Sequence, residues 1–111
     1  MKQFPIQPPI IVNETGAIDV FDSVEAAERY LEPIDVAKNR FVAFDSEGRL
    51  LRLTATSLRV TIEAAEDPPQ HVEDARQLLI KLLGDVGVTE ANVSEKSLAD
   101  LVEIGLKYTT R

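Results

Sequence analysis

Cysteine and tryptophan are absent from the 111-residue sequence, and His71 is its one histidine. Without cysteine the chain has no disulfide, no thiolate-bound zinc or iron–sulfur cluster, and no cysteine nucleophile. A catalytic histidine would need a nucleophile and an orienting group, and the sequence singles out neither. We therefore expect a protein that is not an enzyme and that uses no cofactor and no metal.

Long hydrophobic runs are also missing. The richest run, residues 78–83, is interrupted by Lys81 and is far shorter than the roughly 20 apolar residues of a membrane span. Residues 1–9 contain no unbroken apolar stretch of the kind that a secretory signal requires. If Met1 is the natural start, we expect a cytoplasmic protein that does not bind membranes.

Basic residues are outnumbered, because 12 lysines and arginines face 19 aspartates and glutamates, for a formal net charge of −7. Nucleic acids and anionic membranes repel such a chain. A basic protein partner would be attracted, since complementary charge speeds association and improves selectivity. The acidic excess lies in residues 1–37 and 62–111, which carry −5 each, whereas residues 38–61 carry +3.

The length and the 44% hydrophobic content predict one globular domain over residues 1–111. Prolines should hold residues 1–9 as an extended arm. Apolar and β-branched runs predict strands, and periodic apolar faces that follow capping residues predict helices. The predicted strands cover residues 10–12, 18–21, 41–44, 50–56 and 58–64, and the predicted helices cover residues 23–31, 67–84 and 94–108. The order ββ-α-βββ-α-α predicts an α+β fold, an antiparallel sheet with helices mainly on one face.

Short motifs set the expected ends of these elements. Asp22 or Ser23 can cap the first predicted helix, Asp67 the second and Ser94 the third. Residues 45–48, Asp-Ser-Glu-Gly, predict a type I turn closed by a left-handed glycine. The spacing of a calcium-binding loop is absent from this segment.

Acidic residues on the first predicted helix form the main candidate site. Glu25, Glu28 and Glu32 fall on one stripe beside the apolar face, at spacings where like charges repel by roughly 0.2–0.5 kcal/mol. Asp22 and Asp35 lie at the two ends of the same segment. The stripe is either an ordinary solvated face or a surface shaped for a cationic partner. We predict that these five residues bind the partner.

Two other residues admit a structural or a functional interpretation. His71 falls between apolar positions of the second predicted helix, so we expect its ring to pack at the edge of the core. Gly105 lies on the apolar face of the third predicted helix, where glycine costs about 1 kcal/mol relative to alanine. Close packing on the sheet is the favoured reason for this glycine, and a helix-to-helix dimer contact is the alternative.

Residues 18–36 (IDVFDSVEAAERYLEPIDV) and 44–50 (FDSEGRL) resemble segments of small bacterial immunity proteins of polymorphic or contact-dependent toxin systems. The resemblance spans residues 18–50, about a third of the chain, and contains no catalytic motif. It implies a protein that binds a cognate toxin domain and blocks its active site or its access to substrate. It assigns no residue to the contact with a toxin.

These observations together predict a non-enzymatic acidic binding protein, an immunity protein that neutralises a basic toxin domain. The alternative is a homodimeric adaptor or scaffold that has no toxin partner. Such a dimer would form through an open strand edge or through the helix that contains Gly105. A strict monomer in solution would leave the alternative without support.

Overall fold

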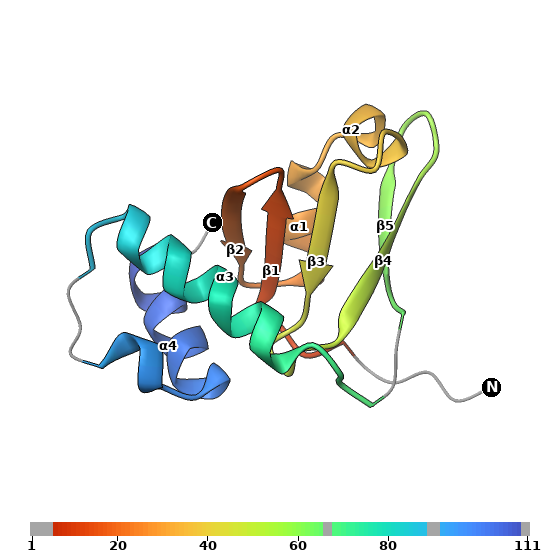
Figure 1. Cartoon of the computed structure of the whole chain (residues 1–111). Helices are drawn as coiled ribbons and strands as arrows, with labels where there is room; N and C mark the ends of the chain where they lie inside the picture. Colours follow the sequence, from red (N-terminus) through yellow and green to blue (C-terminus); the bar gives the residue numbers. More distant parts are fainter. Residues whose placement is uncertain (1–5, 66–67, 89–91, 110–111) are drawn as a thin grey trace.

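A computed structural model describes residues 6–65, 68–88 and 92–109 and contains one antiparallel sheet with helices (Figure 1). Its strands are ordered β2-β1-β3-β4-β5 across the sheet. They are β1 (Ile10–Glu14), β2 (Ala17–Phe21), β3 (Phe41–Phe44), β4 (Leu50–Ala55) and β5 (Val60–Ala64). The helical segments are α1 (Val24–Tyr30), α2 (Pro33–Ala37), α3 (Val72–Asp85), the 3₁₀ turn η1 (Val93–Glu95) and α4 (Leu98–Thr109). The predicted α+β class is confirmed, and the predicted order matches closely, with α2 and η1 added.

The centre of the sheet is apolar on both faces. In β1, Ile10 and Val12 belong to one buried cluster and Ile11 to another, and all three side chains are buried. Neither cluster can be left in water, so α1 and α2 cover one face and α3 and α4 cover the other (Figure 1). The helices are thus divided between the two faces, whereas the sequence predicted them mainly on one. The unbroken apolar run at the start of β1 is the physical reason.

The two layers of helices cover the sheet unequally. On the first face α1 contacts both β2 and β5, the outermost strands, so the sheet curls around this helix. On the second face α3 packs on β1 and β2, and α4 packs on β2. Over β4 and β5 the second face is left to solvent and carries exposed polar side chains, among them Arg52, Thr54 and Glu63.

The first helical segment begins as predicted and divides in two. The hydroxyl oxygen of Ser23 accepts a hydrogen bond from the N–H of Ala26 at 3.0 Å, which confirms one of the two predicted caps. The helix ends at Tyr30, and Pro33 starts α2 at a position where its missing N–H is not needed. The sequence did not predict α2, because five residues are too few to show a helical period.

The two later helices start further along the chain than predicted. The N–H of His71 donates to the carbonyl of Gly48 at 3.0 Å, which holds His71 in a non-helical conformation just before Val72, the first residue of α3. The predicted cap Asp67 lies outside the described residues. Before α4, the hydroxyl oxygen of Ser97 accepts from the N–H of Asp100 at 3.2 Å, so Ser97 caps this helix in place of the predicted Ser94.

The turn between β3 and β4 is organised by a buried carboxylate. Asp45 is fully buried, and its two oxygens accept hydrogen bonds from the backbone N–H groups of Gln7 (3.2 Å), Glu47 (2.9 Å) and Arg49 (2.9 Å) and from Nη1 of Arg49 (3.2 Å). The N–H of Gly48 donates to the Asp45 carbonyl at 3.2 Å, with φ +89° at the glycine. The predicted turn with a left-handed glycine is therefore confirmed. The bond from Gln7 also attaches the described end of the proline-rich arm to this turn; residues 1–5 lie outside the described residues.

Replacing Asp45 should test how much the buried carboxylate contributes. In Asp45→Ala the buried guanidinium of Arg49 keeps only the half-exposed Glu47, and three backbone N–H groups of the turn lose their acceptor, so we expect the free energy of unfolding to fall by about 3–5 kcal/mol. The control Glu47→Ala removes the other, half-exposed carboxylate that pairs with Arg49 and should cost less than about 1 kcal/mol. Urea unfolding measures both free energies. Equal losses of stability in the two variants would contradict the main stabilising role assigned to the carboxylate of Asp45.

Gly48 also marks a close approach of this turn to α3. A Cβ atom built at Gly48 would lie 2.8 Å from both the backbone N and the Cα of Val72. Gly16, in the β1–β2 turn, shares a positive φ of +103° but has open space around it. The two glycines therefore separate backbone strain, which both positions impose, from a steric clash, which only Gly48 imposes.

Alanine substitutions at these glycines should differ in their effect on stability. We expect Gly48→Ala to lower the free energy of unfolding by about 1–3 kcal/mol more than Gly16→Ala, because the new methyl group must push α3 away from the turn. Thermal or urea unfolding of the two variants measures the difference. A Gly16→Ala variant as unstable as Gly48→Ala would mean that strain alone governs both positions.

Candidate binding groove

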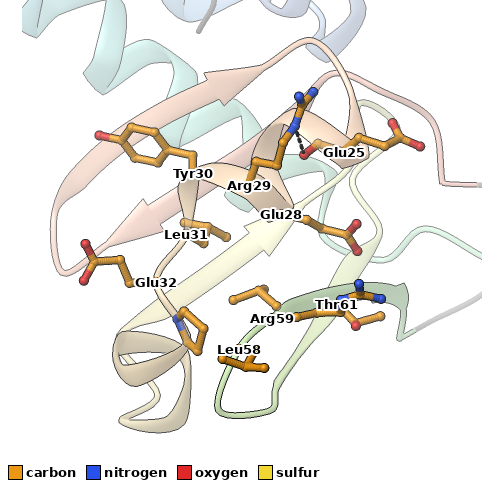
Figure 2. A pocket seen from close by; sticks show the side chains of 11 residues that line it. Glu25, Glu28, Arg29, Tyr30, Leu31, Glu32, Leu58, Arg59 and Thr61 are labelled. Carbon is orange, nitrogen blue, oxygen red and sulfur yellow. Dashed lines mark hydrogen bonds between the residues drawn. The ribbon is translucent and has the colours of Figure 1, made fainter.

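An open groove of about 980 Å³ lies between α1 and the start of the edge strand β5 (Figure 2). One wall is α1 from Glu25 onward with the link to α2, and the other is the tip of the β4–β5 hairpin with the start of β5. The lining residues are Glu25, Glu28, Arg29, Tyr30, Leu31, Glu32, Pro33, Leu58, Arg59, Val60 and Thr61.

The backbone of β5 presents polar groups to the groove. The N–H of Thr56 donates to the carbonyl of Arg59 at 2.9 Å, so the odd-numbered residues of β5 make the ladder bonds to β4. In an antiparallel pair the intervening residues direct their N–H and C=O groups to the other side. Those of Val60 and Ile62 therefore point away from β4, toward the unpaired edge of the sheet.

One of these outward groups is hydrogen-bonded by a side chain of α1. Oε2 of Glu28 accepts from the N–H of Ile62 at 2.7 Å, in a half-buried position. A hydrogen bond to a carboxylate is stronger than one between neutral groups. Glu28 thus ties α1 to the sheet and covers part of an edge that would otherwise be open to pairing.

The five acidic residues that the sequence nominated do not form one surface. Glu25, Glu28 and Glu32 line the groove, and Asp22 and Asp35 do not. The helix ends before Glu32, whose backbone is extended at φ −90° and ψ 132°. Its carboxylate consequently points away from those of Glu25 and Glu28 (Figure 2). The continuous helical stripe that was predicted is therefore broken at its last member.

Two guanidinium groups accompany these carboxylates. Arg29 and Arg59 also line the groove, and Nε of Arg29 donates to the backbone carbonyl of Glu25 at 3.4 Å. The lining therefore combines three carboxylates with two cations, which leaves an excess of negative charge. Such a lining favours a cationic partner. Because two guanidinium groups also lie there, positive charge alone is not enough for binding.

Apolar side chains supply the rest of the lining. Leu58, at the tip of the β4–β5 hairpin, is 91% exposed, and Tyr30 is 50% exposed while its ring packs 5.2 Å from that of Phe21. Leu31 and Val60 are buried and close the inner side of the groove. A highly exposed leucine beside buried apolar side chains is typical of protein-binding surfaces.

Sequence reasoning placed Leu58 incorrectly and missed the contact of Glu28. Leu58 was predicted as the first residue of the strand over 58–64, where its side chain would continue the buried alternation of Val60 and Ile62. The bond between Thr56 and Arg59 instead closes a hairpin whose tip includes Leu58. The Thr-Ser pair before Leu58 is only a weak turn signal. Nothing in the sequence indicates that Glu28 meets Ile62, because the two residues are brought together by the curl of the sheet.

The remaining candidate residues are part of the packed structure. The ring of His71 lies 5.8 Å from that of Phe44, and its Nδ1 lies 3.1 Å from Oδ2 of Asp74, as expected for a residue at the edge of the core. Gly105 is buried in α4. Within the described ranges, no cluster of three or more histidine or acidic side chains could hold a metal ion. No helix in the same ranges combines the length and apolar character needed to cross a membrane.

Comparisons with known proteins found no similar protein. The chain matches no protein-family model, and no similar protein was found among curated proteins or solved structures.

Removing the carboxylate of Glu28 should expose the edge of β5. In Glu28→Ala the N–H of Ile62 loses its acceptor, so we expect the amide of Ile62 to exchange with solvent faster and the stability to fall by about 1 kcal/mol. Glu28→Gln retains an acceptor and should change the exchange rate less. Hydrogen exchange followed by NMR measures both, with Glu25→Ala as a control on the same helix. Equal exchange at Ile62 in all three variants would contradict the contact.

Proposed function

We propose that this chain is a non-enzymatic binding protein that neutralises a basic protein, a cognate bacterial toxin domain, by occupying part of its surface. The observation that carries the proposal is the groove between α1 and β5, where Glu25, Glu28 and Glu32 lie beside the exposed Leu58. Carboxylates attract and orient a cationic surface, and an exposed apolar side chain supplies buried contact area. The net charge of −7 adds a long-range attraction to the same kind of partner.

The resemblance of residues 18–50 to immunity proteins supports the choice of a toxin as the partner. Many toxins of such systems are nucleases, and the clefts of nucleases are basic because they bind phosphates. A surface rich in carboxylates can take the place of those phosphates and exclude the substrate. The resembling segment contains α1 and α2 and therefore the acidic wall of the groove.

A homodimeric adaptor is the second candidate, and the free edge of β5 is the observation that favours it. Two copies could join their sheets through that edge. Light scattering after size exclusion distinguishes the candidates, because the mass of one chain is 12.3 kDa. A monomer that binds a toxin domain supports neutralisation, and a stable dimer without such a partner supports the adaptor.

Charge reversal in the groove should weaken the complex with a toxin domain. The probe is a candidate toxin domain, sought as the variable carboxy-terminal domain of any large secreted protein encoded beside this chain, co-expressed with the chain and then purified. For Glu25→Lys combined with Glu32→Lys we expect an affinity about tenfold lower or weaker still, with a changed dependence on salt. Calorimetry measures the affinity, and survival of the co-expressing cells reports neutralisation.

The matched control reverses two exposed acidic residues on the other side of the molecule. Glu95→Lys combined with Glu103→Lys changes the net charge equally but lies in η1 and α4, away from the groove (Figure 1). This control should bind almost as tightly as the unaltered chain. If both pairs weaken binding equally, only the overall charge matters, and if neither does, the groove takes no part in the proposed function.

A further inference from the structure

We propose that the partner supplies an extended segment that pairs with the outer edge of β5 as an added strand, and that a lysine or arginine of this segment takes over the carboxylate of Glu28. This inference rests on the proposed function and specifies how the groove would hold a basic partner. It follows from the direction of the backbone groups of β5, the position of the groove and the charge of Glu28.

The backbone of β5 is oriented for pairing with a further strand. Val60 and Ile62 direct their N–H and C=O groups away from β4, and β5 is the last strand on its side of the sheet. Added strands are held by such edge groups, while pockets on either side select the alternating side chains. Within the described residues, the outward groups of Val60 and Ile62 make one hydrogen bond, from the N–H of Ile62 to Glu28.

The groove lies where an added strand would run. A strand paired with β5 would lie about 4.8 Å beyond it. The groove follows residues 58–61 of the hairpin on that side and is closed by α1 opposite them. The buried lining residues Leu31 and Val60 form its inner side, and Leu58 lies at the tip of the hairpin. Every second side chain of an added strand would therefore face the groove, and we expect apolar residues at the inner positions that lie over Leu31 and Val60.

The carboxylate of Glu28 determines the charge of the incoming segment. A carbonyl of the added strand would accept the hydrogen bond from the N–H of Ile62, which in the free protein donates to Glu28 at 2.7 Å. The released carboxylate would remain in a half-buried position without its donor, which is costly unless a new partner replaces it. A lysine or arginine on the inner face of the added strand provides that partner, so the segment must be cationic at that position.

A second copy of this chain fits the same edge poorly. In a two-fold antiparallel pairing of β5 with itself, both copies would lose their bond between Glu28 and Ile62. The two released carboxylates would lie on the same face of the joined sheet, close to the symmetry axis, and would repel each other. The charge of the groove therefore selects a foreign cationic strand over self-association.

Two synthetic peptides test the inference without knowledge of the natural partner. The probe is acetyl-TVTKTVT-amide, whose valines and lysine share one face, and its charge control is acetyl-TVTETVT-amide. We expect the lysine peptide alone to shift the NMR signals of the Val60 and Ile62 amides and to slow their exchange with solvent. Methylating the backbone nitrogens of either the threonines or the valines and lysine should abolish binding for one set only, because a strand pairs through one edge.

Protein variants test the same edge from the other side. Val60→Pro removes an N–H that points outward, which an edge strand tolerates, whereas Val60→Ala keeps that N–H. We expect Val60→Pro to bind the lysine peptide about tenfold or more weakly than Val60→Ala, for the loss of one or two hydrogen bonds. An unchanged pattern of ladder amides in β4 shows that both variants are folded.

Four results would overturn the inference: no binding of the lysine peptide at millimolar concentration, equal binding of both peptides, equal tolerance of both methylated sets, or equal affinity of Val60→Pro and Val60→Ala. A dimer of the chain alone that Val60→Pro dissociates would assign the edge to a second copy and would also overturn it. If charge reversal of Glu25 and Glu32 lowers the affinity for the toxin domain but Val60→Pro leaves it unchanged, the proposed function stands and strand addition fails. If neither change alters the affinity for the toxin domain, both proposals fail.

Discussion

The burial of β1 on both faces is the constraint from which the architecture follows. Ile10 and Val12 require cover on one side and Ile11 on the other, so the helices are distributed over two layers. On the first side the sheet curls until α1 contacts both outer strands. That curl brings α1 beside the free edge of β5 and so creates the groove. The candidate site is therefore a product of how the core is closed.

The sequence predicted the fold better than it predicted the site. Strand alternation, the cap at Ser23 and the turn at residues 45–48 depend on neighbouring residues, so they can be recognised locally. The layer assignment of the helices depends on which faces remain apolar after the strands have paired, and no local pattern records it. The acidic residues were nominated as one group, but only Glu25, Glu28 and Glu32 line the groove, and the bend between α1 and α2 turns Glu32 aside. The contact of Glu28 with Ile62 joins residues 34 positions apart and could not be foreseen.

Glu28 connects the two interpretations of the acidic helix. As a structural residue it shields a backbone N–H at the edge of the sheet, and as a binding residue it offers a carboxylate to a cationic strand. The two roles exclude each other in time, because the carboxylate must leave Ile62 before a strand can pair there. The same side chain would thus block pairing at the edge of β5 in the free protein and would form an ion pair with a cationic partner.

The uneven cover of the sheet has a consequence for its internal mobility. The β1–β2 pair is packed between two helical layers, whereas the β4–β5 hairpin is supported by α1 and α2 on one face and meets solvent on the other. Segments with fewer buried contacts open at lower free energy than the protein as a whole. The hairpin that borders the groove is then the part of the sheet that can adjust its shape while β1 and its neighbours stay fixed, so the candidate site and the rigid core lie in different halves of one sheet.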